Sequence, residues 1–482
     1  MDFTEIYKQT GGLVAFSPGG HFILTAVQDR VVVRRADSFQ ITRTWQLAES
    51  GADASAKAAS SPAPTITHAG WSCDSEYVLA ACAKRGVVEV FKLRDENFNA
   101  RVDCGAEGLV KAEWTPDGRS ILCFSEWGLR VTAWSLLTGT ATHIQYPIHP
   151  DRGYAWSING RYFVLGERHK SKDTLGVYDT HQSYRLVRHF PLPSASLASI
   201  SLSPLGNHVA VWEGPLEFKI YILTLAGDLL GTFSPEPDRG LGIRCVTWHP
   251  SGSYLLVAGW DDKIYVLESV TWGPVAILEL NSRIPAGVNI WREPSNWIEA
   301  TQGHGFLTYE RIRPPWSLTI TRPELAKAYP KCGPVQLSFN VSGTLLLARF
   351  ESTPSVIHLF DFPSALDPAS QARTPMPALR SVLIHTQPVL SAQWNTVRKG
   401  ALVACCGGES AYLWSDEWVG VSEDGEQEEE ADSEMAECIG VPAKSFNARE
   451  VKWAPDGKGL VLLSKETFCC AFEVEDGAAP EE

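Results

Sequence analysis

The chain repeats one short phrase nine times, and this repeat constrains its fold more than any other feature. Each copy has an apolar residue, a spacer, an aromatic residue or Leu, a small polar residue and then a tight turn, as in Ala15–Gly20 and Lys452–Gly457. A single repeat cannot bury its apolar face alone, so neighbouring repeats must stack against one another. The aromatic or Leu positions are Phe16, Trp71, Trp114, Trp156, Leu202, Trp248, Phe339, Trp394 and Trp453.

The residues around each phrase predict short antiparallel strands joined by hairpin turns. Pro, Asp and Gly favour the turn, and the alternating residues beside it favour strands. After Trp248 the chain has strand-like runs at Tyr254–Gly259, Lys263–Leu267 and Val275–Leu278. Four strands per unit, with spacings of 42 to 46 residues in the middle of the chain, are typical of WD40 repeats. We therefore expect an all-β, WD40-type β-propeller.

The two ends of the chain predict how the propeller closes. The last unit has strand-like runs at 458–464 and 467–472, and its fourth strand is missing. The segment Phe3–Tyr7 precedes the first phrase and can supply that strand, which removes an open sheet edge. We expect nine units in one ring closed by this N-terminal strand. Because propellers usually have four to eight blades, seven or eight blades or a split double ring remain alternatives.

Three insertions interrupt a single propeller that is expected to span residues 1–482. Residues 49–66 are rich in Ala, Ser and Pro, residues 281–333 are rich in aromatic residues and Pro, and residues 415–441 are acidic. We expect the acidic segment to be a solvated, disordered loop. The aromatic insertion either packs on the ring, which we favour, or presents a docking surface through Trp291, Trp297 and Trp316.

The net charge of −14 arises largely from the acidic segment. Eleven acidic residues and no basic residue lie between Asp416 and Glu437, and the rest of the chain carries a net charge of −3. A nearly neutral propeller body has no broad basic surface, so we do not expect nucleic-acid binding. We also expect no membrane span, because the chain has no run of 18 apolar residues.

The cysteines and the first residues predict a compartment. Eleven cysteines are scattered without CxxC or Cys/His ligand spacing, which indicates reduced, buried thiols. The sequence that follows Met1 lacks the pattern of a secretory leader. We expect a soluble protein of the cytosol or nucleus.

Motifs of catalysis are absent from the sequence. It contains no HExxH, GxGxxG, GxxxxGK[ST] or GxSxG, and its twelve histidines are dispersed. His68, His208 and His249 lie beside blade anchors, where a structural hydrogen bond is the expected role. We therefore predict that the chain is not an enzyme and needs no cofactor or metal.

Function is then expected to lie in a protein-binding surface. Propellers often use the face that carries the turns between the second and third strands, and Arg and Trp are enriched among interface anchors. The candidate partner-binding rim consists of Lys84, Arg85, Trp127, Arg168, Lys170, Lys172 and Trp260.

Stretches between the phrases resemble a known family. The chain is similar to the WD-repeat proteins of centrosomes and fungal spindle pole bodies that help to anchor microtubule minus ends. It departs from them in the Ala/Ser-rich loop and in the acidic run. The matching stretches are Met1–Glu5, Lys84–Phe91, Gly108–Val110, Trp114–Arg119, Leu129–Leu136, Asn159–Tyr162, Leu216–Ile220, Val270–Trp272 and Leu463–Cys469.

This resemblance implies an adaptor protein. Its expected location is the cytoplasm, as part of the cytoskeleton at the microtubule-organising centre. Family members work with a coiled-coil anchoring protein and, in fungi, with a kinesin-14 motor, and connect indirectly to microtubules and the gamma-tubulin complex. An acidic-to-neutral ring gains little attraction from acidic tubulin, so we expect indirect attachment to the microtubule. Two alternatives remain, namely a WD40 substrate receptor of a ubiquitin ligase and an RNA- or translation-associated propeller.

Overall fold

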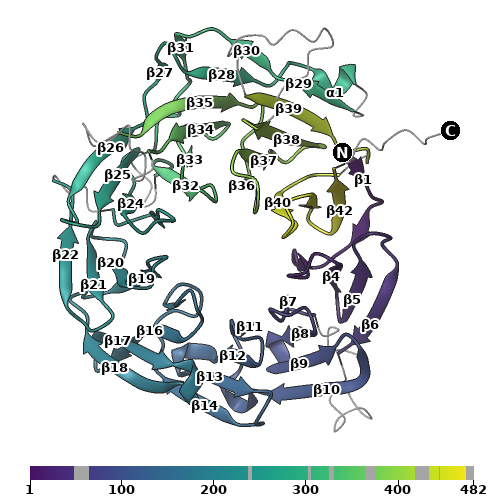
Figure 1. The fold of residues 1–482 in the computed structure, drawn as a ribbon, viewed down its shortest axis with the longest axis vertical. Coiled ribbons are helices and arrows are strands. Elements are labelled where there is room, and N and C mark those ends of the chain that lie inside the picture. The colour runs from purple at the N-terminus through teal and green to yellow at the C-terminus, as the bar shows by residue number, and fades with distance from the viewer. Residues whose placement is uncertain are drawn as a thin grey trace.

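The computed structural model shows nine β-sheets arranged around one central axis in a single ring (Figure 1). The structure describes residues 1–47, 65–236, 241–301, 305–324, 330–363, 376–417, 434–443 and 446–473. Each blade is built from three or four consecutive antiparallel strands, and blades follow one another in chain order. The predicted all-β propeller, its nine units and its single ring are confirmed.

The strands of the nine blades have the following bounds. Blades 1 to 3 contain β3 (Val14–Phe16), β4 (Phe22–Val27), β5 (Arg30–Arg35), β6 (Ile41–Gln46), β7 (His68–Trp71), β8 (Tyr77–Cys82), β9 (Val87–Lys92), β10 (Asp95–Asp103), β11 (Lys111–Trp114), β12 (Ser120–Phe124), β13 (Arg130–Ser135) and β14 (Ala141–Gln145). Blades 4 to 6 contain β15 (Tyr154–Trp156), β16 (Tyr162–His169), β17 (Lys172–Asp179), β18 (Arg185–Pro191), β19 (Leu197–Leu202), β20 (His208–Glu213), β21 (Ile220–Thr224), β22 (Leu229–Phe233), β23 (Cys245–Trp248), β24 (Tyr254–Ala258), β25 (Lys263–Glu268) and β26 (Pro274–Glu279). Blades 7 to 9 contain β32 (Pro334–Phe339), β33 (Leu345–Phe350), β34 (Val356–Asp361), β35 (Ala378–Ile384), β36 (Ser391–Trp394), β37 (Ala401–Cys405), β38 (Ser410–Ser415), β39 (Met435–Gly440), β40 (Glu450–Trp453), β41 (Gly459–Leu463) and β42 (Thr467–Phe472).

The small polar residue of the repeated phrase closes the first hairpin of each of several blades. Ser17 Oγ accepts a hydrogen bond from the backbone N–H of Phe22, five residues later, at 3.1 Å. Asn340 Oδ1 accepts the equivalent bond from Leu345 at 3.0 Å. These side chains satisfy a backbone donor that the turn leaves unpaired, which explains why the phrase requires a small polar residue there. The same bond is made by Ser72, Ser157 and Ser203.

The tryptophans of the phrase join neighbouring blades. The indole Nε1–H of Trp114 donates to the backbone oxygen of Gly70, the residue before the anchor of the preceding blade, at 3.1 Å. Trp453 makes the same bond to Gln393 at 3.1 Å. Each bond fixes the innermost strand of one blade to that of the previous one. Equivalent bonds run from Trp71 to Ala15 and from Trp394 to Ser338.

Replacement of one such tryptophan tests these inter-blade bonds. We expect Trp453→Phe to lower the free energy of unfolding by about 1 kcal/mol, because the variant removes the indole hydrogen bond to the oxygen of Gln393. Trp248→Phe is the matched control, since the indole N–H of Trp248 is buried with no hydrogen-bond acceptor among the described residues. Equal losses in urea denaturation of the two variants would show that the bond contributes nothing measurable.

The N-terminus completes the last blade, as predicted. Strands β1 (Asp2–Phe3) and β2 (Tyr7–Lys8) both pair antiparallel with β42 and lie at its outer edge. Figure 1 shows the N-terminus beside β42, next to the first blade. Strand β42 thus has neighbours on both sides, and the ring has no open edge at this junction.

The aromatic insertion widens two blades. It contains β27 (Arg283–Ile284), β28 (Asn289–Arg292), α1 (Trp297–Ala300), β29 (Phe306–Thr308), β30 (Glu310–Ile312) and β31 (Trp316–Ser317). Strand β28 pairs in parallel with β35, and β30 lies outside β28, so blade 7 has six strands. Strand β29 pairs with β39 and gives blade 8 five strands. The insertion therefore packs on the outer wall of the ring, visible at the top of Figure 1.

The boundaries of the other two insertions differ in part from the prediction. The acidic insertion was expected to extend from residue 415 to residue 441 as a disordered loop, but Met435–Gly440 form β39, the fourth strand of blade 8. Every residue of β39 after Met435 is buried, with Ala436 and Cys438 in one hydrophobic cluster and Ile439 in another, which is why this end of the segment is ordered. Residues 418–433, and most of the Ala/Ser-rich segment 49–66, lie outside the described residues.

Eight of the eleven cysteines are buried, as expected for thiols on propeller strands. Burial raises the pKa of Cys405 and of Cys469 to about 12, so these thiols are protonated and poorly nucleophilic at neutral pH. Among the described residues, no helix has the length and apolar character needed to cross a bilayer.

Candidate protein-interaction surface

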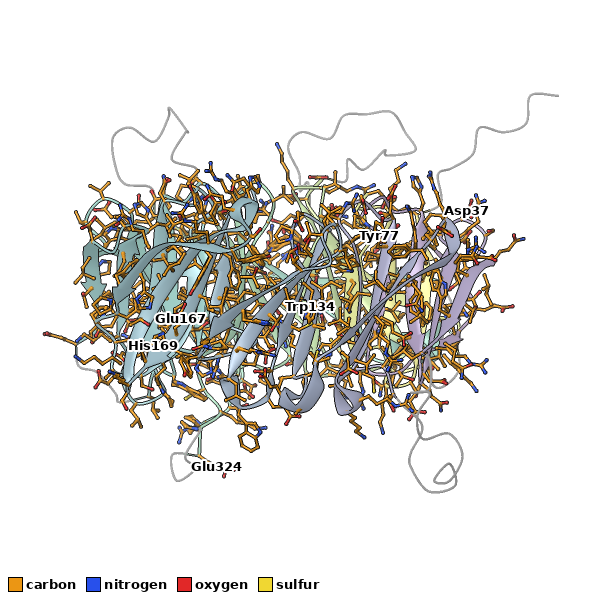
Figure 2. The ribbon with its side chains drawn as sticks, turned by 90° about the horizontal axis from the view of Figure 1, so that it is seen from below. Asp37, Tyr77, Trp134, Glu167, His169 and Glu324 are labelled. Carbon is orange, nitrogen blue, oxygen red and sulfur yellow. The ribbon has the colours of Figure 1, made fainter. Side chains whose placement is uncertain are left out.

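Successive turns of a blade alternate between the two faces of the ring, so all turns between second and third strands share one face. Figure 2 shows the ring from the side, with Asp37 near one face and Glu324 beyond the other. The candidate rim residues lie in or beside the turns between the second and third strands of blades 2, 3, 4 and 6. Their elements are the 3₁₀ turn Ala83–Arg85, the 3₁₀ turn Glu126–Gly128, the hairpin of β16 and β17, and the turn between β24 and β25.

Trp127 is the most exposed large apolar side chain of the described residues, at 91% of its full accessible area. Its backbone has a φ of 61°, a left-handed conformation that costs a bulky residue about 1–2 kcal/mol. Gly128 follows with a φ of 61°, and a Cβ there would lie 2.8 Å from the oxygen of Pro147. The surrounding turn therefore holds the indole outward, into solvent, at an energetic cost.

Two further apolar side chains extend this surface. Leu129 and Tyr146 are each 47% exposed, and the backbone N–H of Tyr146 donates to the oxygen of Leu129 at 3.0 Å. The backbone oxygen of Tyr146 in turn accepts a hydrogen bond from the backbone N–H of Arg168 at 3.0 Å, which places the end of β16, the second strand of blade 4, beside it. We call Trp127, Leu129 and Tyr146 the blade-3 patch.

The hairpin of β16 and β17 adds basic charge next to the blade-3 patch. Lys170 and Lys172 are exposed at its tip, where Lys170 and Ser171 both have positive φ values. Arg168 is engaged differently, because its Nε donates to the buried carboxylate of Asp173 at 2.7 Å. That hydrogen bond raises the pKa of Arg168 above its usual value. Of the three predicted basic residues in this hairpin, the two lysines can face a partner, whereas Arg168 holds the hairpin together.

Trp260, which was predicted to lie on the rim, is only partly exposed. The guanidinium carbon of Arg244 lies over its ring, 4.5 Å from the ring centroid. Arg244 also pairs with Glu351 of blade 7 at 2.8 Å. Trp260 therefore belongs to a contact between blades 6 and 7. Lys84 and Arg85 are exposed in blade 2.

The candidate docking tryptophans of the insertion are mostly packed inside the protein. Trp291 and Trp297 are 6% and 2% exposed, which agrees with the favoured packing interpretation and leaves neither ring free to anchor a partner. Trp291 donates its indole N–H to the buried carboxylate of Glu434 at 3.2 Å. Trp316 remains 36% exposed, with the guanidinium of Arg292 over its ring at 5.9 Å.

A second buried carboxylate fixes the insertion to blades 7 and 8. Glu293 Oε1 accepts from Trp297 Nε1 at 2.8 Å and from the Tyr412 hydroxyl at 2.7 Å. Its Oε2 accepts from the backbone N–H and the hydroxyl of Thr386 at 2.6 and 2.8 Å. Burial alone would raise the pKa of Glu293, but the hydrogen bonds from Thr386, Tyr412 and Trp297 outweigh burial and lower it.

Glu293→Gln removes this charge while it keeps the size of the side chain. We expect a loss of about 3 kcal/mol in the free energy of unfolding, because an amide nitrogen would face donors that now bind a carboxylate. Since the folded-state pKa lies below the ordinary value of 4.5, the contribution of Glu293 is present above that pH and is lost as the pH falls through the folded-state pKa. Denaturant melts of wild type, the variant and the exposed control Glu299→Gln from pH 3 to 7 check this. A variant as stable as the control would contradict it.

His249 has the structural role that its position predicts. Its Nε2 lies 3.0 Å from the backbone oxygen of Gly343 in the next blade, and its ring packs against Phe339 and Phe362. Burial lowers its pKa, so the ring is neutral at physiological pH.

Known proteins resemble this chain over nearly all of its length. The WD domain, G-beta repeat family matches residues 227–267, which cover the last strand of blade 5 and most of blade 6. The WD repeat-containing protein WRAP73 of Mus musculus is 30% identical over 495 aligned residues, which cover 98% of this chain and 96% of that protein. The chain belongs to the WRAP73 family of WD repeat-containing proteins.

More distant proteins are similar to this WRAP73 family member as well. An uncharacterised WD repeat-containing protein of Schizosaccharomyces pombe is 22% identical, with 81% of this chain and 77% of that protein covered. Among solved structures, the C-terminal WD40 domain of Sif2 aligns over 98% of this chain and 99% of its own at 9% identity, with a TM-score of 0.49.

The structure of this WRAP73 family member also brings together residues that sequence reasoning missed. Leu129 and Tyr146 had no signal, because neither their exposure nor the positive φ of Tyr146 is visible in the sequence. His169 and His189, 20 positions apart in the chain, lie against the same carboxylate of Glu167. Their convergence depends on the pairing of β16 and β18 with β17, which no local motif encodes.

Proposed function

We propose that this protein is a non-enzymatic adaptor of the spindle pole body or centrosome, which scaffolds a complex that anchors microtubule minus ends. A WD-repeat ring of the WRAP73 family is expected to act as a protein-interaction scaffold, and the resemblance of its inter-repeat stretches supports the spindle-pole role. The observation that carries the adaptor proposal is Trp127, a tryptophan held outward in a strained conformation on one face of a rigid ring.

The blade-3 patch favours a helical partner with a defined chemistry. Its three apolar side chains can receive the apolar stripe of an amphipathic helix, and Lys170 and Lys172 beside it complement acidic residues on that helix. A coiled-coil anchoring protein has such stripes. We therefore propose the coiled-coil partner for this patch, with a kinesin-14 motor in the same complex.

Purification of the tagged chain from mitotic cells tests the adaptor proposal. We expect a coiled-coil protein and a kinesin-14 motor to co-purify in constant ratio, together with the gamma-tubulin complex. Recovery of a ubiquitin-ligase adaptor, or an RNA association that salt disrupts, would instead support the alternative functions.

Indirect attachment to the microtubule has its own test. Because the body of the ring is nearly neutral, we propose that the partner or motor makes the contact with tubulin. The purified chain should stay in the supernatant when microtubules are pelleted at physiological salt, and should pellet once both partners are added. Pelleting of the chain alone would contradict this.

A further inference from the structure

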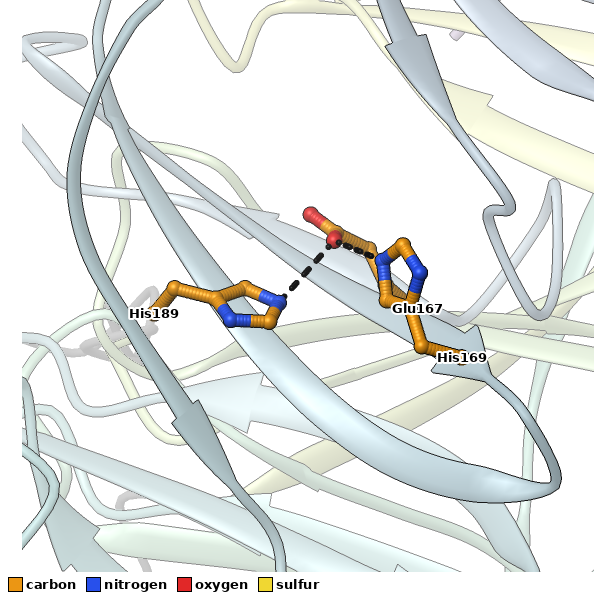
Figure 3. Close-up of side chains that lie close together, drawn as sticks. All are labelled: Glu167, His169 and His189. Atoms are coloured by element: carbon orange, nitrogen blue, oxygen red, sulfur yellow. Dashed lines mark hydrogen bonds and ion pairs between the residues drawn. The ribbon is translucent and has the colours of Figure 1, made fainter.

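Three potential metal ligands converge on the outer part of blade 4 (Figure 3). The Nε2 atoms of His169 and His189 lie 3.2 and 3.3 Å from Oε2 of Glu167. All three ligand atoms are within 4.8 Å of one another. Glu167 is buried, whereas both imidazoles are partly exposed, so the group can be reached from solvent. Figure 2 places Glu167 and His169 at the side of the ring, between its two faces.

The sheet register explains why the three side chains meet. Glu167 and His169 are two residues apart on β16 and therefore point to the same face of the sheet. Gly176 of β17 pairs with His189 of β18, which brings that imidazole to the same face. A Cβ at Gly176 would overlap Oε1 of Glu167, so the glycine leaves the space that the carboxylate occupies. This face of blade 4 therefore accommodates the Glu167 carboxylate beside both imidazoles.

We propose that Glu167, His169 and His189 form a binding site for a divalent transition-metal ion, with Zn²⁺ as the best fit. Tetrahedral zinc with bonds of about 2.0–2.1 Å has ligands roughly 3.3 Å apart, close to the two observed separations between nitrogen and oxygen. Two imidazoles and one carboxylate suit zinc better than magnesium or calcium, which prefer oxygen ligands.

The surroundings of the three ligands support this assignment. Oε1, the carboxylate oxygen that the imidazoles do not contact, accepts a hydrogen bond from the hydroxyl of Tyr178, the kind of outer contact that orients a ligating carboxylate. Among the described residues, no Lys or Arg forms an ion pair with Glu167, and a bound dication would neutralise this buried charge. A cavity of about 420 Å³, lined also by His143 of blade 3, adjoins the group and leaves room for a water as fourth ligand.

The site has a structural consequence for the interaction surface. Zinc would tie the end of β16 to β18, next to the hairpin that carries Lys170 and Lys172. The ring of His169 also packs edge-on against that of Tyr146, a member of the blade-3 patch, and the two ring centroids are 5.2 Å apart. Occupancy of the site is therefore expected to raise the melting temperature of the full chain.

Zinc titration of the full chain, stripped of metal by a chelator, tests the proposal. We expect the His169→Gln/His189→Gln variant to bind one equivalent of Zn²⁺ fewer than wild type and to lose the zinc-dependent rise in melting temperature. Tyr178→Phe should keep the site but weaken its affinity about 10- to 100-fold. His21→Gln, at a histidine in another blade, should bind as wild type does. X-ray absorption of the zinc-loaded chain should show nitrogen and oxygen ligands, including imidazole, without sulfur.

Two results would overturn the site. One is the same number of bound zinc ions in wild type and in the double variant, and the other is sulfur in the zinc coordination shell. Both imidazoles are at least 36% exposed, so the substitutions are expected to leave the fold intact. If the double variant nevertheless unfolds without metal, the single variant His169→Gln replaces it in the titration. We expect this variant to bind zinc at least about 10-fold more weakly than wild type. Unchanged zinc binding would contradict the site.

Discussion

Deletion of residues 1–8 is expected to abolish the cooperative unfolding of the ring. The deletion removes β1 and β2 from β42 and exposes an unpaired strand edge, which favours aggregation. It also removes Tyr7, whose ring stacks on Phe39 of blade 1 and packs against Phe468 of blade 9. This segment therefore joins the first blade to the last, and its loss should cost more than about 4–5 kcal/mol, the upper end for local changes.

Single substitutions test the packing of this segment while they keep both N-terminal strands in place. Tyr7→Ala should lower the free energy of unfolding by about 2–3 kcal/mol, because the partly buried ring of Tyr7 packs between Phe39 of the first blade and Phe468 of the last. Ile6→Ala is the matched control, since Ile6 is 42% exposed and should change stability little. A synthetic peptide of residues 1–12 added to the deleted chain should restore its melting transition. Melting of the deleted chain at the wild-type temperature would show that the ring does not depend on this closure.

Trp127→Asn is expected to weaken capture of the coiled-coil partner at least about 30-fold, the equivalent of roughly 2 kcal/mol for an interface hot spot. The same change should not destabilise the protein, because Asn tolerates the left-handed backbone that Trp127 adopts at a cost. Loss of binding together with equal or higher stability distinguishes an interface residue from a packing residue. Partner affinity and thermal unfolding of the same preparation check both parts.

Leu137→Asn provides the control for Trp127→Asn. Leu137 is 75% exposed and lies between β13 and β14 in the same blade, on the opposite face of the ring. The Leu137→Asn variant should bind the partner as tightly as wild type does. If both variants bind normally, the blade-3 patch is not the docking surface, and Trp316→Ala, at the exposed tryptophan of the outer insertion, would then test that insertion.

The repeated phrase was sufficient to predict the fold because its determinants are local. Ser17 and Phe22, which close the first hairpin, are five residues apart, and the same spacing recurs in other blades. The closure by Phe3–Tyr7 was predictable because the last blade lacked a strand. In contrast, β28 pairs in parallel with β35, and Trp291 finds its acceptor Glu434 143 positions away. No local pattern specifies such pairings, so the position of the insertion required the structure.

The interaction surface was predictable only in part, for a similar reason. Trp127 and Trp260 both occupy turns between second and third strands and look alike in sequence. Arg244 covers the ring of Trp260, whereas the left-handed turn at Trp127 projects its ring into solvent. The difference lies in contacts with other blades and in backbone conformation, and neither leaves a signal in the order of residues.

The central claim, an adaptor that is held at the spindle pole through the blade-3 patch, is tested most directly by imaging the tagged chain in dividing cells. We predict that the wild-type chain concentrates at the spindle poles, and that Trp127→Asn, expressed at the same level, is diffuse in the cytoplasm. Wild-type signal absent from the poles would contradict the adaptor function. Equal signal of both chains at the poles would contradict the role of the patch.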